Sequence, residues 1–567
     1  MLLSNLDLLA TAPGGVARLR ELILTLAVQG KLVPQDPADE PAGVLLQKIR
    51  AEKDRLVAEG KIKRGKPLAE IAEEEKPFGL PVGWAWVRCD DYFLELCTGP
   101  FGSMIHQEDY VRDGIPLINP SHMVGGRIVH DPRVTIRTAD AERLSAYALS
   151  VGDMVLARRG EVGRYAYVTA QEHGWLCGTG SFFVRLYSQC NREYLGLIFS
   201  DARFRQHLQG ESVGTTMTNL NQRILLNALL ALPPLAEQSR IVTRVEELMR
   251  LCDALQAKGQ LEAAQHAQLV STLLGTLTAS TTPEELADHW QRVAQHFDLL
   301  LDRPEAIDAL EQTLLQLAVR GLLVPQDPAD EPASALLQRI RAEKDRLIAE
   351  AQIKRDKPLP PITDEEKPFE LPVGWEWVRI NDLAEVQGGI QKTQLRRPVK
   401  QHFPYLRVAN VQRDALRLEE IERFELTLEE LERWRLANGD LLIVEGNGSA
   451  DEIGRCAVWD GSIDPCVYQN HLIRVRCFQQ DCMAFIKLFL NAPSGADEMK
   501  RLAITTSGLY NLSVGKIRNY VVPVAPLPEQ SRIVARVTAL RRLCADLRQR
   551  LAERQSVQAR LAEALVH

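Results

Sequence analysis

Three arginines that lie close together in the first half of the chain are the clearest candidates for recognition chemistry. Arg158 and Arg159 follow a short apolar run, and Arg164 begins the next one. No lysine occurs between Lys76 and Lys258, so this segment uses arginine where a lysine could also supply charge. A guanidinium group can bind guanine or a phosphate through two parallel hydrogen bonds. These residues predict contacts with DNA, although a solvated arginine cluster would have the same composition.

Two runs rich in hydroxyl and amide side chains lie at matching places in the two halves of the chain. Such groups bind phosphates and base edges, so both runs are candidates for DNA contact. Asn219 aligns with Asn511 and Leu220 with Leu512, which also favours a shared structural role such as helix capping. The candidate residues are Thr215, Thr216, Thr218, Asn219 and Asn221 in the first run, and Thr505, Thr506, Ser507, Tyr510 and Asn511 in the second.

In the second half, a basic and polar loop follows Gly388 and Gly389. We expect this loop to contact DNA, because it combines cations with amides that can bind base edges. A later loop, between two predicted strands, adds further polar candidates. The residues are Gln391, Lys392, Gln394, Arg396 and Arg397 in the basic loop, and Asn447, Ser449 and Arg455 in the later one.

The sequence lacks the motifs of a catalytic or metal site. Asn119-Pro120-Ser121 has neither the second proline nor the aromatic residue of an adenine methyltransferase tetrapeptide, so a turn explains it better. No GxxxxGK[ST] phosphate loop occurs. The acidic runs at 73–76 and 364–367 faintly resemble a nuclease site, but a solvated acidic linker is the better interpretation. We therefore predict no catalytic residue, no metal and no cofactor in this chain.

An internal duplication organises these candidates. Several long motifs recur in the same order, while the segments between them, roughly 89–232 and 380–524, differ almost completely. The chain is therefore constant, variable and constant, twice over. The repeated pairs are 26–42 with 317–333, 75–88 with 366–379, and 234–245 with 526–537.

The constant parts have the periodicity of helices. Ile241, Val245, Leu248, Cys252 and Leu255 are spaced by four and three residues, and the series from 533 to 551 repeats that spacing. Such an a/d seam requires a partner helix. The first long helix should run over about 236–277, which is roughly 60 Å. Further helices are expected near 17–29, 42–58, 308–320 and 333–349.

The variable segments predict mixed α/β domains. Gly152-Asp153 and Gly439-Asp440 each precede a strand, a loop and a returning strand, which is typical of a hairpin. Residues 204–209 and 487–490 predict helices. The expected fold class is therefore α+β: two globular α/β domains, related by a pseudo-two-fold duplication, joined by long helices in an antiparallel coiled coil. The predicted domains are 1–88, 89–233, 234–379, 380–525 and 526–567.

Composition adds three expectations. No stretch approaches 18 apolar residues, so we expect a cytoplasmic protein that does not cross a membrane. The ten cysteines form no CxxC pair and should be buried free thiols. The four tryptophans at 84, 86, 375 and 377 recur in the constant parts, which favours packing of the domains onto the helices over stacking on bases.

The repeated GKLVPQDPADEPA…AEKDRL and the LPPLAEQSRIV that opens a heptad helix resemble the DNA-specificity subunits of type I restriction-modification systems. The resemblance covers essentially the whole chain. It implies two target-recognition domains that each read one half of a split DNA site, with helices as a ruler between them. It also implies partners: two adenine methyltransferase subunits and restriction subunits that hydrolyse ATP. S-adenosylmethionine, ATP and Mg²⁺ would then belong to those partners.

The net charge of the chain limits the DNA hypothesis. The formal charge is −7, whereas most nucleic-acid-binding domains are basic. We therefore expect this chain alone to hold DNA weakly, with its partners supplying much of the phosphate contact. The alternative is a coiled-coil scaffold whose two domains bind proteins or small ligands.

Overall fold

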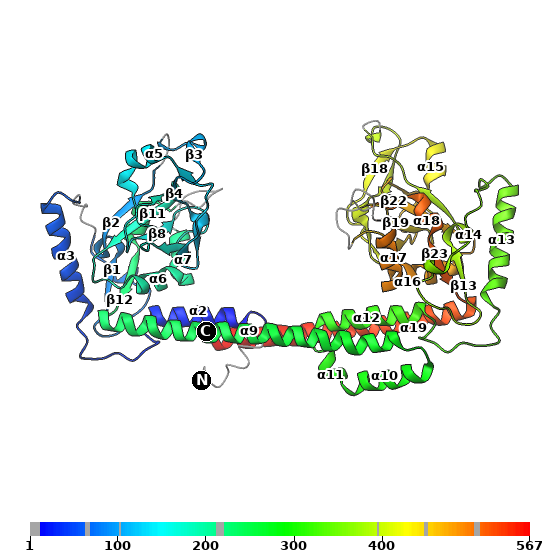
Figure 1. Cartoon of the computed structure of the whole chain (residues 1–567), viewed down its shortest axis with the longest axis horizontal. Helices are drawn as coiled ribbons and strands as arrows, with labels where there is room; N and C mark the ends of the chain where they lie inside the picture. Colours follow the sequence, from blue (N-terminus) through cyan, green and yellow to red (C-terminus); the bar gives the residue numbers. More distant parts are fainter. Residues whose placement is uncertain are drawn as a thin grey trace. The chain divides into compact units, whose positions relative to one another are not determined.

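The structure is a computed structural model that describes residues 12–62, 69–100, 104–210, 220–393, 396–446, 452–503 and 511–566. It divides into two compact units, Met1–Leu261 with Gln555–His567, and Glu262–Arg554. Two long helices, α9 (Leu235–Ala279) and α19 (Leu527–Val566), contribute a part to each unit. Each unit also contains an α/β domain and an arm helix beside it (Figure 1).

The first unit contains seven further helices and twelve strands among its described residues. The helices are α2 (Gly15–Val28), α3 (Ala42–Ala58), α4 (Cys89–Tyr92), α5 (Thr138–Arg143), α6 (Arg192–Ser200), α7 (Ala202–Gly210) and α8 (Gln222–Asn227). The strands are β1 (Ala85–Arg88), β2 (Phe93–Thr98), β3 (Tyr110–Val111), β4 (Ile115–Ile118), β5 (Met123–Val124), β6 (Arg127–Ile128), β7 (Thr135–Ile136), β8 (Met154–Ala157), β9 (Tyr165–Tyr167), β10 (Leu176–Cys177), β11 (Ser181–Leu186) and β12 (Leu229–Leu232).

The second unit repeats this set except for β3, and adds a helical excursion, α10 (Pro283–Gln295) and α11 (Phe297–Leu300). Its other helices are α12 (Pro304–Val319), α13 (Ala333–Ala349), α14 (Ile380–Leu383), α15 (Leu428–Trp434), α16 (Met483–Asn491), α17 (Pro493–Ala503) and α18 (Val514–Asn519). The strands are β13 (Glu376–Arg379), β14 (Ala384–Gly388), β15 (His402–Leu406), β16 (Val411–Gln412), β17 (Ala415–Leu416), β18 (Glu422–Glu425), β19 (Leu441–Val444), β20 (Cys456–Val458), β21 (Val467–Tyr468), β22 (Leu472–Cys477) and β23 (Val521–Val524).

The two α/β domains share one topology although their sequences differ. The larger sheet has the order β2-β11-β8-β9 in the first unit and β14-β22-β19-β20 in the second. A second sheet, containing β10-β4-β7 or β21-β15-β18, holds one parallel pair in each domain. The expected hairpins are confirmed as β8–β9 and β19–β20, both antiparallel. The expected helices are confirmed as α7 and α16.

Each domain is connected to the helices through a two-stranded sheet formed by its ends. Strand β1 pairs with β12 just before α9 begins, and β13 pairs with β23 just before α19 begins. The chain thus enters and leaves each domain at the same point. A segment of almost any sequence can occupy the interval, provided that it returns to this sheet.

The expected long helices are confirmed. Their apolar seams, however, pack partly against the α/β domains and not only against a partner helix. Ile241 and Val245 are buried in the core that α9 shares with α2 and the first domain. Ile533 and Val537 are likewise buried in the core of the second domain. Only further along α19, at Cys544 and Leu551, does the seam pack with α9 and α12.

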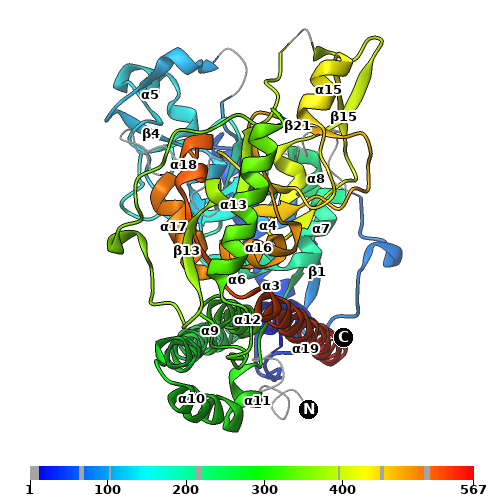
Figure 2. The same cartoon turned by 90° about the vertical axis from the view of Figure 1, so that its right-hand side faces the viewer.

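Within the second unit, α19 lies beside α12 and the end of α9, which Figure 2 shows end-on. The contacts along α19 show that it runs opposite to α12. Arg554, late in α19, donates to the backbone carbonyl of Asp302. The carboxylate of Asp302 lies 3.2 Å from the imidazole of His266 in α9. Arg541, earlier in α19, pairs with Glu311 in the middle of α12. The helices of this unit are therefore fixed in register by charged residues around an apolar core.

Of the four tryptophans at the domain entrances, Trp84 and Trp375 pack onto the long helices, as the sequence predicts. Trp84 is 9% exposed and donates its indole N–H to Glu237 in the first turn of α9, at 3.0 Å. Trp375 makes the same 3.0 Å bond to Glu529 of α19. Burial raises the pKa of both glutamates. We refer to this pair of bonds as the tryptophan–glutamate anchor.

The acidic runs are only partly solvated linkers. Glu75 accepts two hydrogen bonds at 3.0 Å from Arg88, which is 6% exposed at the end of β1. Glu366 pairs with Arg379 in the same way. The last acid of each run is therefore the counter-ion of a buried arginine, because Arg88 and Arg379 could not be buried without one.

A glycine beside the anchor provides a test of this packing. In Gly30→Ala, the new Cβ would lie 2.6 Å from Pro81 and 2.8 Å from the Trp84 ring, at a φ of +69°. We expect a loss of about 2–4 kcal/mol in the free energy of unfolding, measured in urea. The control is Gly60→Ala, which has the same φ and no atom within 4 Å. Its counterpart is already Ala351 at φ 56°, so the fold accepts alanine there, and we expect a loss of only about 1–2 kcal/mol. Equal losses would contradict the packing argument.

Candidate nucleic-acid interface

The β8–β9 loop of the first domain presents Arg158 and Arg159 side by side. The backbone of Arg158 is fixed from both sides: its N–H donates to Gly180 and its carbonyl accepts from Leu220. Its guanidinium lies 5.4 Å from the centre of the Phe182 ring. Burial, and then the charge of Arg159, lower the pKa of Arg158. Arg159 is exposed and makes no ion pair within the described residues, so the loop offers it to a ligand on a rigid base.

Arg164 and Arg455 have the same structural role in the two domains. Arg164 pairs with Glu161 and donates to the carbonyl of Pro120. Arg455 pairs with Glu452 and donates at 2.8 Å to the carbonyl of Val408. Each arginine thus ties the hairpin loop to the segment that follows a strand of the second sheet. Their predicted contact with DNA stays a prediction, and Arg455, at 8% exposed, could make it only after leaving these partners.

The alignment of Leu220 with Leu512 marks a shared structural contact. Both side chains are fully buried, and their N–H groups donate to Arg158 and to the equivalent Glu445. The helix cap lies just after each leucine: the Asn221 side chain accepts from Ile224 at the start of α8. In α18 the equivalent cap is Ser513. The caps of α8 and α18 are therefore Asn221 and Ser513 rather than the aligned asparagines. Asn511 is exposed, and its backbone N–H donates to Ala503.

Acidic side chains neutralise part of the basic loop in the second domain. Lys392 lies 3.1 Å from Glu422, which raises the pKa of the lysine. Arg396 lies 2.9 Å from Glu430 of α15. Gln391 and Arg397 are exposed, and Arg397 makes no ion pair in the part of the chain that the structure describes. Arg397 is therefore the cation of this loop that is best placed to meet a phosphate.

The remaining predicted contacts lie outside the described residues. They are Thr215, Thr216, Thr218, Asn219, Gln394, Asn447, Ser449, Thr505, Thr506, Ser507 and Tyr510. Leu220, which lies within the first run, donates its N–H to the carbonyl of Arg158. Asn221, the candidate of this run that the structure describes, directly follows that bond.

Sequence reasoning missed the acids that hold these cations. The pairs Glu161–Arg164 and Glu452–Arg455 share a three-residue spacing in both halves, which was a usable signal. Glu422 and Glu430 lie far from their partners in the sequence and carried no such signal.

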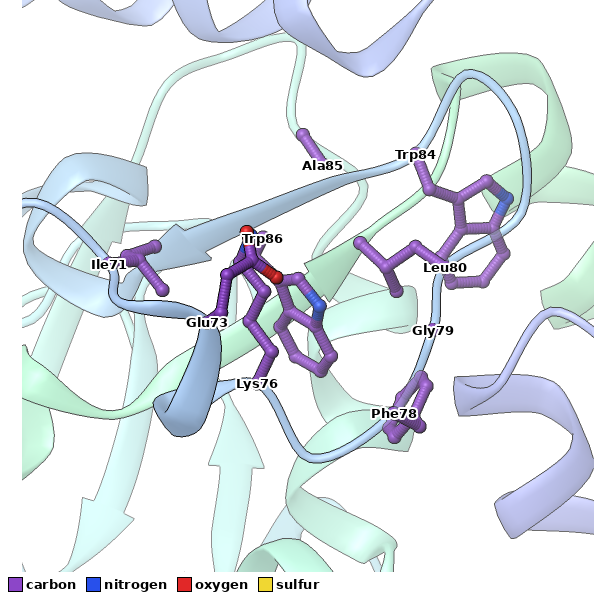
Figure 3. Close-up of a pocket in the computed structure, with 9 residues that line it drawn as sticks. All are labelled: Ile71, Glu73, Lys76, Phe78, Gly79, Leu80, Trp84, Ala85 and Trp86. Atoms are coloured by element: carbon purple, nitrogen blue, oxygen red, sulfur yellow. The ribbon is translucent and has the colours of Figure 1, made fainter.

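A hollow of about 640 Å³ lies beside the anchor, between residues 71–80 and β1 (Figure 3). Trp86 lines it, with its ring 4.9 Å from that of Phe78. Glu73 and Lys76 at its rim pair with each other. Its aromatic residues hold the linker against the domain, and its charges are mutually satisfied.

Other kinds of site find little support in the described residues. No group of three His, Cys, Asp or Glu among them is arranged to hold a metal ion. No helix in that part of the chain is long and apolar enough to cross a membrane. All ten cysteines are free, and burial raises the pKa of the buried thiols, which disfavours reactive thiolates.

Two arginine substitutions distinguish a cation that stabilises the fold from one that is exposed and available to a ligand. We expect Arg455→Ala to lower the free energy of unfolding by about 1–3 kcal/mol, because it removes the internal hydrogen bonds of a buried side chain. Arg159→Ala should change it by less than about 0.5 kcal/mol, because the side chain is exposed. Urea unfolding of the full chain measures both. A larger loss for Arg159→Ala than for Arg455→Ala would show that the two assignments are reversed.

Comparison with known proteins gives a consistent answer. The family described as "Type I restriction modification DNA specificity domain" matches residues 102–265 and 372–554. The EcoAI specificity subunit of a type I restriction enzyme from Escherichia coli is 35% identical, covering 97% of this chain and 93% of its own length. The EcoEI specificity subunit from Escherichia coli is 36% identical with the same coverage. A solved structure from work on assembly of the type I R-M system is 18% identical, covers 86% of this chain and 98% of its own, and has a TM-score of 0.45.

Proposed function

The chain belongs to the type I restriction-modification DNA specificity family, and from this we propose that it is the subunit that selects the DNA target. The observation that carries the proposal is the combination of one repeated frame with two domains of the same topology and different sequence. A frame that is kept while its domains diverge suits a protein that must present two different recognition surfaces in one fixed way. The target is accordingly bipartite and asymmetric.

We place the two target-recognition domains at 89–233 and 380–525. In each, the hairpin loop of the larger sheet and the polar run near α8 or α18 form the recognition surface. Arg159 and Arg397 make the primary contacts, because they are exposed and not neutralised by neighbouring acids. The other residues predicted above, in the two polar runs and in the basic loop of the second domain, complete the surface.

The helices act as a ruler between the two recognition domains. In this proposal α9 and α19 pair as an antiparallel coiled coil along their length, and the bases between the half-sites are spanned rather than read. Support comes from the second unit, where the two helices run in opposite directions around a shared apolar core. The 45 residues of α9 correspond to roughly 68 Å, about two turns of duplex.

Catalysis belongs to partner subunits in this proposal. Adenine-N6 methyltransferase subunits would use S-adenosylmethionine, and restriction subunits would use ATP and Mg²⁺ to translocate and cut DNA. The chain itself contributes recognition and assembly. Its net charge of −7 fits this division, since much of the phosphate contact can come from partners that surround the DNA.

Exchanging one variable segment tests the recognition role. If residues 89–232 are replaced by the corresponding segment of a relative with another specificity, only one half of the methylated sequence should change. The other half and the spacer should stay the same. The measurement is sequencing of methylated adenines in DNA treated with the reconstituted methyltransferase complex and S-adenosylmethionine. A scaffold that binds only proteins through these domains would leave both half-sites unchanged, and methylation by the chain alone would contradict the non-catalytic assignment.

Lengthening the helices tests the ruler. Insertion of seven helical residues after Leu261 in α9 and seven after Arg554 in α19 keeps the heptad phase and adds about 10.5 Å. Because one base pair rises about 3.4 Å, the spacer of the methylated site should grow by about three base pairs while both half-sites stay the same. The control is an insertion into α9 alone, which leaves the pair unmatched and should reduce methylation. An unchanged spacer after the matched insertion would reject the ruler.

A further inference from the structure

The loop that leads into β15 presents two cations on the surface of the second α/β domain. Arg397 and Lys400 are both exposed, and the side chain of neither makes an ion pair within the described residues. Between them, Val399 is 76% exposed, so this loop projects from the domain. An exposed loop usually has several conformations, and a ligand that selects one of them loses part of its affinity. We refer to residues 396–401 as the β15 entry loop.

A single carboxylate fixes the β15 entry loop. Glu425, the last residue of β18, accepts hydrogen bonds from three consecutive backbone N–H groups: those of Val399 at 2.8 Å, Lys400 at 3.0 Å and Gln401 at 2.8 Å. The N–H groups of Gln401 and Val399, and then that of Lys400, hold the pKa of Glu425 below its usual range. The carboxylate therefore stays ionised, and its charge-assisted bonds fix three successive residues at once.

The other end of the β15 entry loop is attached as well. Arg396 donates to Glu430 at 2.9 Å, and Glu430 also accepts from the N–H of Thr427, just before α15. Between the two attachments, the ring of Pro398 restricts its own φ. Arg397 therefore lies on a backbone that is held on both sides, while its own side chain extends into solvent.

The first α/β domain shows that the fold itself does not require a carboxylate here. The corresponding loop leads into β4, where Pro116 pairs with Thr135 as Pro404 pairs with Arg423 in the second domain. In the first domain the Thr135 hydroxyl accepts from the N–H of Gly114 at 2.9 Å. A neutral group thus closes the equivalent loop. In the second domain an acid does so beside two exposed cations, although an acid in general repels phosphate.

We propose that Glu425 is a positioning residue for DNA recognition, which holds the β15 entry loop in the arrangement in which Arg397 and Lys400 bind phosphates of the second half-site. Two neighbouring cations without internal ion pairs complement the phosphate backbone of a duplex. Glu425 repels that backbone little, because its oxygens accept from three backbone N–H groups. The inference rests on the proposed function. It adds Lys400 to the contacts and assigns a role to an acid that charge alone would place far from DNA.

The sign of one substitution tests this role. By charge alone, Glu425→Ala should strengthen DNA binding, because it removes repulsion between an acid and phosphate. The positioning role predicts the opposite: binding should weaken about fivefold or more, and the slope of log affinity against log salt should become shallower by about one. Anisotropy of a fluorescently labelled duplex that contains the methylated site measures binding at several salt concentrations. The binding partner is the reconstituted complex of this chain with its methyltransferase subunits.

Combined variants show whether the loss of affinity passes through the two cations. Arg397→Ala with Lys400→Ala alters only exposed side chains and should weaken binding about tenfold. Adding Glu425→Ala to this pair should cause less than about a twofold further loss, because the contacts that Glu425 positions are already absent. Glu425→Gln retains one acceptor oxygen for the loop, so it should lose less affinity than Glu425→Ala.

The matched control is Glu429→Ala, which removes the same charge from the first turn of α15. The side chain of Glu429 is exposed and makes no hydrogen bond or ion pair within the described residues, so its removal releases no loop. The affinity of this variant should be unchanged or slightly higher. Circular dichroism should show all variants folded.

The outcomes distinguish this inference from the proposed function. If the wild-type complex prefers its methylated site to an unrelated duplex, and Glu425→Ala binds that site as tightly or more tightly, the positioning role is wrong while the proposed function stands. A loss of the same size in the background of Arg397→Ala with Lys400→Ala also rejects it, because the loss then does not pass through the cations. If the wild-type complex shows no preference for its site, the proposed function fails and this inference fails with it.

Discussion

The buried bond between a tryptophan at the domain entrance and a glutamate in the first turn of a long helix is the constraint on which the rest of the structure depends. A recognition domain can be exchanged or diverge only if its attachment does not. In each unit the anchor joins the entering strand to the helix that leaves the domain, and the glutamate is nearly inaccessible to water. The bond therefore fixes both ends of the variable segment at once.

An ion pair on the next turn of the same helix adds a second point of attachment. Arg240, one turn after Glu237, binds Asp39 of the segment between the frame helix and the arm, and Arg532 binds Asp330 in the second unit. The anchor and this ion pair thus hold the domain entrance and the segment before the arm on successive turns of one helix. This explains why the repeated motifs cluster at the domain borders. The residues of the constant parts make internal contacts at these borders. The variable segments between them hold the surface residues that differ between the two domains.

The sequence predicted the parts of this fold that arise from local periodicity. Helices such as α3 and α13, each opened by a proline, were predicted to the residue, and the hairpins followed from a Gly-Asp turn before an apolar run. The errors concern contacts between distant residues. Nothing local distinguishes Glu75, which neutralises buried Arg88, from its solvated neighbours. The seam of α19 likewise does not reveal that its first turns face an α/β domain.

The candidate site shows the same division between features set by local sequence and features set by distant contacts. This division affects how strongly the chain can hold DNA. Arginines could be identified by type, but their availability depends on tertiary contacts: Arg396 is neutralised by Glu430, while Arg397 beside it is exposed. Non-specific affinity grows with the number of phosphates that a protein neutralises, and internal pairing keeps that number small here. Under the proposed function, a chain built in this way binds stray DNA weakly. Its discrimination then comes from a few well-placed groups, whose contribution counts fully only when partner subunits close around the correct duplex.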